Sequence, residues 1–485
     1  MRILGLNAIF HDPAAAVVVD GRVVAAAEEE RFSRRKHGKR PLPFSAWELP
    51  ELAATWCLEK AGLRPDELDA VTYSFDPALA RPQESLGLDD PWDHVRQTYA
   101  REAPNFVAEA LPGLDAGVFR FVPHHIAHAA SAALAGPPAY RNASVLVADG
   151  RGEATSHLSA RYRDGRPDVL ARTALPHSLG LFYEEVTAHL GFLRSCDEFK
   201  VMALASYGRP RFLDELRRSV YATGDGSFRT EPVNLSALAK ARRPHEDWTP
   251  EQADLAASVQ AVTEEVLLDL VRWLHARTGD RHLSMAGGVA LNCVANSRIA
   301  AEGPFEHIWV QPAAGDAGTA LGGALHVAEV MGDRTTPMAG ADLGRSWDDD
   351  ELEAWLCRAR VPYSRPHDIA DVVARALAAD DVVAWFQGRS EFGPRALGHR
   401  SLLAHPGRAS NLERLNDVKG REQFRPVAPM VLAERAAELF DGPVPSRYML
   451  FTHDVAEHWR ERIPAVVHVD GTARIQTVDG GDNPL

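Results

Sequence analysis

The sequence predicts an α/β protein with two domains, the first of which contains two related halves. The chain has 485 residues, enough for two or three domains that each bury a core of their own. Segments typical of strands alternate with segments of helical period along the chain, which is the pattern of α/β architecture. A strand–turn–strand pattern at the N-terminus also returns near residue 144, and this weak repeat indicates the two halves.

The two copies of the repeat are defined by short apolar or alternating segments. Strands are expected at residues 3–7, 14–19, 22–27, 144–148 and 156–163. Asp20-Gly21 and Asp164-Gly165 are expected to form the hairpin turns, because Asp-Gly accepts the positive φ values that such turns need.

Helices with 3.6-residue spacing follow these strands. They are expected at 51–61, 125–135, 252–278 and 317–330. Residues 332–347 are rich in Gly, Pro, Asp and Ser and resemble a linker, and a new helix is expected at 348–358. We therefore expect one domain over 1–340 and a second over 350–485.

Composition excludes several classes of protein. The chain is 45% hydrophobic and 25% charged, close to the globular average, and no apolar run approaches the roughly 20 residues that span a bilayer. Residues 1–7 resemble a first strand and not a signal peptide, so we expect a cytoplasmic protein that does not bind membranes. The four cysteines form no CxxC pair, which argues against structural zinc or a disulfide framework. A net charge of −14 disfavours a nucleic-acid partner.

His124 and His128 are the first candidate metal ligands. At positions i and i+4 of a helix, both imidazoles project from one face and can bind one cation. Asp149 ends an apolar strand and Asp316 precedes a helix, both common positions for ligands at the rim of an α/β sheet. This set suits Fe(II) or another first-row divalent ion, although an HxxxH alone is more often an ordinary helix start.

The nucleotide-binding candidates lie around a Gly-Gly turn. Gly287 and Gly288 follow a strand and open a helix, so their backbone N–H groups could approach a phosphate, and Gly150 and Asn292 are grouped with them. The alternative is a tight turn used for packing. Lys36 lies in a basic run that could neutralise phosphate or form a solvated loop.

His11 and Asp12 are the catalytic candidates. They fall in the loop between the first two strands, where a histidine of near-neutral pKa can take a proton from a hydroxyl. The alternative is an ordinary loop histidine.

The second domain concentrates basic residues among glycines. Arginine forks bind phosphate oxygens in pairs, so this part of the sequence predicts a site for a small, multiply anionic substrate. The candidates for binding carbamoyl phosphate and ATP are Arg389, Arg395, Lys419, Arg421, Arg425 and Arg474.

The whole chain resembles the O-carbamoyltransferase family that includes the tobramycin, geldanamycin and nodulation-factor enzymes. The resemblance depends on the order and spacing of several motifs together. They are the opening Gly-Leu-Asn with His11-Asp12, residues 28–38, the HxxxH, Gly287-Gly288-Val289 and residues 388–403.

The resemblance implies a Kae1-like N-terminal domain with the duplicated actin-like (ASKHA) fold, and a YrdC-like α/β C-terminal domain. It implies that the second domain converts carbamoyl phosphate and ATP, with Mg²⁺, to carbamoyl adenylate and pyrophosphate. The first domain then transfers the carbamoyl group to a hydroxyl of a small natural product in antibiotic or other secondary metabolism. In this scheme the metal and Gly287-Gly288 hold the adenylate.

The resemblance also assigns roles residue by residue. His124, His128 and Asp316 match iron ligands, Asp149 matches a direct or indirect ligand, and His11 matches the general base. Family members continue past the motif matching Asn483-Pro484 into a segment with an Asn-Thr-Ser-Phe-Asn stretch, so the second domain is expected to lack the family's C-terminal end.

Two other functions remain open at this point. One is a tRNA threonylcarbamoyl transferase, which normally lacks the second domain, and the other is a non-catalytic actin-like ATP-binding protein. The acceptor also stays open among macrolide or ansamycin, aminosugar and oligosaccharide hydroxyls, and a homodimer is the base expectation for such an enzyme.

Overall fold

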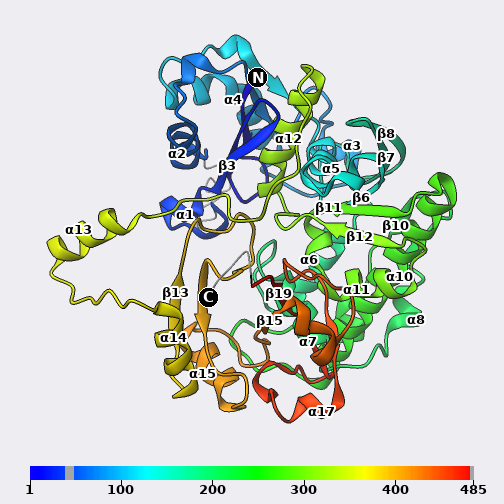
Figure 1. The fold of residues 1–485 in the computed structure, drawn as a ribbon. Helices are drawn as coiled ribbons and strands as arrows, with labels where there is room; N and C mark the ends of the chain where they lie inside the picture. Colours follow the sequence, from blue (N-terminus) through cyan, green and yellow to red (C-terminus); the bar gives the residue numbers. More distant parts are fainter. Residues whose placement is uncertain (39–48, 481–485) are drawn as a thin grey trace. The chain divides into compact units, whose positions relative to one another are not determined.

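The computed structural model describes residues 1–38 and 49–480. The chain divides into two compact units, Met1–Ala341 and Asp342–Leu485, which are described separately (Figure 1). Within the described residues, no helix combines the length and apolar character needed to cross a membrane.

The first sheet of unit 1 has five strands in the order β3-β2-β1-β4-β5. They are β1 (Arg2–Asn7), β2 (Ala14–Val19), β3 (Arg22–Glu28), β4 (Ala70–Tyr73) and β5 (Phe119–Phe121). β1 pairs antiparallel with β2, opposing Leu4 to Val17, and parallel with β4, opposing Gly5 to Thr72. Asp20 and Gly21 have φ values of 49° and 74°, so the predicted hairpin turn is confirmed.

The second sheet repeats this topology. It is ordered β12-β11-β6-β7-β8, with β6 in the central place that β1 holds in the first sheet. β6 is antiparallel to β7 and parallel to β11. The strands are β6 (Ser144–Ala148), β7 (Thr155–Arg163), β8 (Arg166–Ala174), β11 (His282–Ala286) and β12 (His307–Val310). The α/β class and the duplicated first unit are therefore confirmed.

Two helices, α5 (His124–Ala135) and α12 (Ala317–Val330), pack against each other inside unit 1 (Figure 1). A Cβ on Gly322 would lie 1.8 Å from the backbone oxygen of Ala127, so only glycine permits this approach. α12 also packs on β1, where a Cβ on Gly5 would lie 1.9 Å from the oxygen of Ala320. These contacts hold the first turns of both helices close together.

The long helix α10 (Pro250–Thr278) shows how the sequence limits a helix. Thr249 and Gln252 form a capping box at its start, and Gly279 ends it at φ 64°. The predicted helices at 51–61 and 317–330 are confirmed, while α5 begins one residue and α10 two residues earlier than expected. The remaining helices and strands of unit 1 are α1 (Glu30–Ser33), α2 (Glu51–Ala61), α3 (Gln83–Leu86), α4 (Asp93–Ala110), α6 (Leu179–His189), α7 (Glu198–Ala205), α8 (Leu213–Leu216), β9 (Val220–Ala222), β10 (Phe228–Thr230), α9 (Leu235–Leu238) and α11 (Cys293–Glu302).

Unit 2 contains three small sheets around a modest core. β13 pairs antiparallel with β14, β15 pairs parallel with β19, and β16, β17 and β18 form a three-stranded sheet. Its core includes Phe440, Val455, Ile463 and Ile475. The elements are α13 (Asp349–Ala359), α14 (Ile369–Ala378), β13 (Val383–Phe386), β14 (Arg400–Leu403), α15 (Ser410–Val418), β15 (Met430–Leu432), α16 (Ala436–Leu439), β16 (Phe440–Asp441), β17 (His453–Val455), α17 (Glu457–Arg460), β18 (Thr472–Ala473) and β19 (Gln476–Val478).

Candidate metal and transfer site

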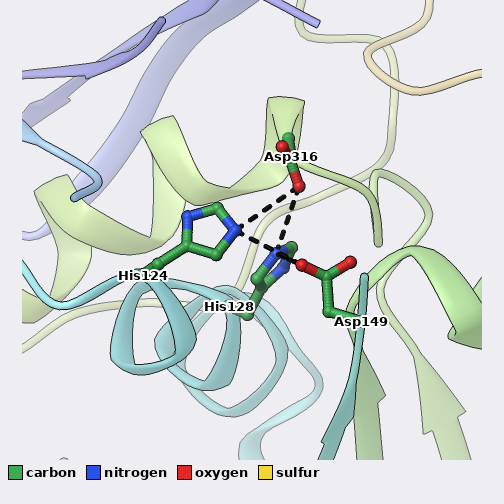
Figure 2. Close-up of side chains that lie close together, drawn as sticks. All are labelled: His124, His128, Asp149 and Asp316. Carbon is green, nitrogen blue, oxygen red and sulfur yellow. Dashed lines mark ion pairs between the residues drawn. The ribbon is translucent and has the colours of Figure 1, made fainter. Parts of the chain in front are cut away.

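Four side chains from three elements of unit 1 converge on one point (Figure 2). His124 and His128 project from successive turns at the start of α5, Asp149 directly follows β6, and Asp316 directly precedes α12. His124 Nε2 lies 3.4 Å from Asp149 Oδ2 and 3.5 Å from Asp316 Oδ1. His128 Nε2 lies 3.6 Å and 3.5 Å from the same two oxygens. The structure therefore brings together all four predicted metal ligands.

The polar atoms of this cluster fit a cation. All four residues are buried, and among the described residues no hydrogen-bond partner exists for Nε2 of His124, Nε2 of His128 or either carboxylate oxygen of Asp316. His124 Nδ1 lies 2.9 Å from the carbonyl oxygen of Ser74, so this nitrogen carries the proton and Nε2 is left as an acceptor. Buried polar atoms without partners are costly, and a divalent ion would satisfy them together.

The electrostatics of the cluster also require positive charge. Burial alone would lower the pKa of His124, but the carboxylates of Asp316 and Asp149 outweigh burial and raise it well above its usual value. Burial alone would raise the pKa of Asp149, but the facing imidazoles of His124 and His128 hold it well below its usual value. Two ionised carboxylates at one buried point are stable only with a protonated imidazole or a bound cation.

His11 lies at the edge of this cluster. Its Nε2 is 3.7 Å from Asp316 Oδ2, and its Nδ1 is 2.9 Å from Asp12 Oδ2. The buried amide of Asn7 donates to the carbonyl oxygens of both His11 and Asp12, at 2.9 Å each. Burial would raise the pKa of Asp12, but the rings of His11 and His37 outweigh burial and lower it well below its usual value.

The predicted glycine turn lies beside the cluster. Gly287 follows β11 at φ 93°, and a Cβ there would lie 2.2 Å from the oxygen of Ala148. The N–H of Gly288 donates to Asp149 Oδ1 at 2.9 Å. Gly150 follows Asp149 directly and is packed against Gly180. The backbone of the glycine turn thus approaches the His/Asp cluster closely.

Two other nucleotide-binding candidates have different surroundings. The side chain of Asn292 accepts from the N–H of Ala295 as the N-cap of α11, and its amide exchanges two hydrogen bonds with Gln260. Lys36 places its ammonium group 5.8 Å from the ring centre of Phe199 in α7. Neither lies among the side chains of the metal cluster.

Glu153 is a residue that sequence reasoning missed. Its Oε1 accepts from the backbone N–H of His124 at 2.8 Å and of Asp76 at 2.9 Å, so it holds the first turn of α5 in place. Burial is the main cause that raises the pKa of this carboxyl. Its position four residues after the candidate ligand Asp149 was the signal in the sequence that could have identified it.

The basic candidates of unit 2 lie in three places. Lys419, Arg421 and Arg425 lie near one another, and burial together with Arg425 lowers the pKa of Arg421 to about 10. Arg389 donates to the carbonyl oxygens of Gly344, at 3.1 Å, and Leu343. Lys419, Arg421 and Arg425 concentrate positive charge, as an anion site requires, while Arg421 also donates to Asn416 Oδ1 and to the carbonyl oxygen of Pro426.

Arg395 and Arg474 are partly buried and lie on segments that meet. Arg395 lies two residues before Leu397, whose carbonyl oxygen accepts a hydrogen bond from Gln476 Nε2 at 2.8 Å. Arg474 lies two residues before that glutamine. The structure therefore joins the segments that carry these two arginines.

Family models described as carbamoyltransferase N-terminus match residues 2–113 and 108–325, and the model described as carbamoyltransferase C-terminus matches 374–485. The nodulation protein NolNO of Sinorhizobium fredii is 37% identical over 98% of this chain and 71% of its own length. The uncharacterized protein sll1178 of Synechocystis is 36% identical over 99% of this chain and 87% of its own length. Nodulation protein U of Azorhizobium caulinodans is 30% identical over 99% of this chain and 88% of its own length.

The match with the HypF structure of T. kodakarensis covers 69% of this chain and 48% of the HypF chain, with 15% identity and a TM-score of 0.43. A likeness this distant says nothing of the activity.

The duplicated sheets and the matches along the chain define a group-transfer enzyme of the α/β class. The chain belongs to the carbamoyltransferase family.

Proposed function

We propose that this enzyme forms carbamoyl adenylate from carbamoyl phosphate and ATP, and then transfers the carbamoyl group to a hydroxyl of a small natural product. The observation that carries the proposal is the buried His124, His128, Asp149 and Asp316 cluster, which lies next to both His11 and the bare Gly287-Gly288 backbone. A cation site and a base at one point are what carbamoyl transfer from an adenylate needs.

In the transfer step the acceptor hydroxyl oxygen attacks the carbamoyl carbon. The bond from that carbon to the phosphate oxygen breaks, AMP leaves, and His11 Nε2 takes the hydroxyl proton. Asp12, 2.9 Å from His11 Nδ1, stabilises the imidazolium that forms. The four clustered side chains would hold a divalent cation, Fe(II) by family resemblance, which supplies Lewis-acid neutralisation of phosphate and carbonyl oxygens.

Unit 2 would carry out the activation step. Carbamoyl phosphate loses phosphate to water, the carbamate oxygen attacks the α-phosphorus of ATP, and pyrophosphate leaves. The adjacent charges of Lys419, Arg421 and Arg425 would hold the phosphates. A carbamate becomes a good electrophile only when its oxygen carries a leaving group such as AMP.

The first experiment supplies the purified chain with ATP, Mg²⁺, Fe(II) and radiolabelled carbamoyl phosphate, without an acceptor. We expect carbamoyl adenylate and pyrophosphate, and an Arg421→Ala variant as control should form far less. If neither product appears, synthetic carbamoyl adenylate is offered with macrolide, ansamycin and sugar alcohols. Failure of both assays would contradict the proposed function.

A further inference from the structure

Asp12 lies between two histidine rings. Its Oδ2 is 2.9 Å from His11 Nδ1, and its Oδ1 is 2.6 Å from His37 Nδ1. Each carboxylate oxygen therefore accepts from a different imidazole, and His37 belongs to the basic segment to which the proposed mechanism gives no task.

The backbone around His37 reinforces this arrangement. The N–H of His37 donates to Glu30 Oε2 at 2.9 Å, and the N–H of Asp12 donates to the carbonyl oxygen of His37 at 3.3 Å. On the other side, Asn7 holds the carbonyl oxygens of His11 and Asp12. The loop is thus fixed from two directions.

A carboxylate that accepts at both oxygens cannot rotate without losing a hydrogen bond. The plane of Asp12 is therefore set by His37, and Asp12 in turn sets the ring of His11. With Nδ1 donating to Asp12, His11 presents Nε2 toward Asp316, 3.7 Å away. The same ordering of a base by a carboxylate operates in serine hydrolases.

We propose that His37 is a positioning residue for carbamoyl transfer, which holds Asp12 so that His11 keeps its Nδ1–H tautomer and turns Nε2 to the acceptor hydroxyl. This inference rests on the proposed transfer function. Deprived of His37, Asp12 gains rotational freedom, and His11 samples orientations and tautomers that cannot take the proton.

Two variants separate the hydrogen bond from the backbone. His37 has φ 58°, a conformation that glycine and asparagine tolerate better than other residues, so His37→Gly and His37→Asn are matched in this respect. Asparagine can still donate from Nδ2 to Asp12, and glycine cannot. Transfer is measured from synthetic carbamoyl adenylate, which bypasses unit 2.

We expect His37→Gly to lower kcat by about 10- to 100-fold, the usual loss for a residue that orients a reactive one, with an acceptor KM changed less than about twofold. His37→Asn should regain most of the lost kcat. Equal losses in both variants, or a wild-type kcat in His37→Gly, would overturn the proposal.

A second readout does not need activity. The ring ¹⁵N signals of His11, assigned by their loss in His11→Gln, report which nitrogen carries the proton. They are recorded with diamagnetic Zn(II). We expect one Nδ1–H tautomer in the wild type and in His37→Asn, and a mixture in His37→Gly. If the wild type transfers nothing, the proposed function fails, and an unchanged His11 spectrum in His37→Gly separately rejects the role of His37.

Discussion

Ser74 links the His/Asp cluster to the loop that holds His11 and Asp12. Its carbonyl oxygen accepts from His124 Nδ1 at 2.9 Å, and its hydroxyl donates to Asn7 Oδ1 at 3.0 Å. Asn7 in turn holds the loop of His11 and Asp12. The orientation of a candidate metal ligand and the position of the proposed base thus depend on the same serine.

Replacing Ser74 by alanine should remove one of these links and keep the other. The carbonyl still accepts from His124, but the buried Oδ1 of Asn7 loses its donor, at a cost of about 1–3 kcal/mol. Urea unfolding should show this loss, and transfer should fall by about tenfold. Ser131→Ala is the control, because its buried hydroxyl donates only to a helix carbonyl at His128. A Ser74 variant as stable and active as that control would refute the link.

The carboxylate of Asp90 connects helix α4 to the loop after β6. Asp90 accepts from Arg96 at 2.9 Å and from Arg151 at 2.8 Å. Both guanidinium groups lie over the ring of Phe10, at 5.5 Å and 4.9 Å from its centre. Because Phe10 precedes His11, this ion network also supports the loop that holds His11 and Asp12.

The network predicts an acid-dependent stability. Burial would raise the pKa of Asp90, but Arg96 and Arg151 outweigh burial and lower it to about 2. The unfolded chain binds this proton near pH 4, at the usual aspartate pKa of about 3.9. The stabilisation is therefore complete above pH 4 and is lost as the pH falls toward 2.

Asp90→Asn should be less stable than the wild type at pH 6, and the difference should shrink between pH 4 and pH 2. Chemical unfolding monitored by circular dichroism across this range measures it. A constant difference down to pH 2 would mean that Arg96 and Arg151 do not lower the pKa of Asp90 in the folded chain.

The elements that could be predicted are those set by local sequence. The Asp20-Gly21 turn and the 317–330 helix follow from turn chemistry and period, and they appear as expected. The parallel pairing of β15 with β19 joins segments far apart in the chain, so no local pattern indicates it.

The candidate site divides in the same way. The four candidate ligands could be brought together from the sequence because His124 and His128 share one face of a helix, while Asp149 directly follows a strand and Asp316 directly precedes a helix. The contacts of Glu153 with α5 and of His37 with Asp12 depend on how loops meet after folding. Asn292 was expected to bind nucleotide together with the Gly-Gly turn, and its side chain also caps α11, a contact that is set after folding.

At the scale of the whole molecule, the two compact units predict two separable half-reactions. His11 belongs to unit 1 and Arg395 to unit 2. His11→Ala should abolish transfer from synthetic carbamoyl adenylate and leave adenylate formation intact, because the proposed mechanism uses His11 only on the acceptor hydroxyl. Arg395→Ala should do the reverse.

Radiolabelled carbamoyl phosphate measures adenylate formation, and added carbamoyl adenylate measures transfer. Loss of both activities in a folded His11→Ala variant would contradict this division.

The convergence of α5 and α12 contributes to the electrostatic potential at the cluster of His124, His128, Asp149 and Asp316. Both helices begin there, and each N-terminus carries roughly half a positive elementary charge. Together they offset part of the charge of Asp149 and Asp316, so a cation is held less firmly than two carboxylates alone would hold it, while phosphate is attracted. A phosphate bound at the helix ends would offset their positive charge and so strengthen cation binding. Metal and nucleotide should therefore bind cooperatively. Calorimetric titration with Mn(II) should show tighter binding in the presence of AMP, and equal affinity in both conditions would exclude this coupling.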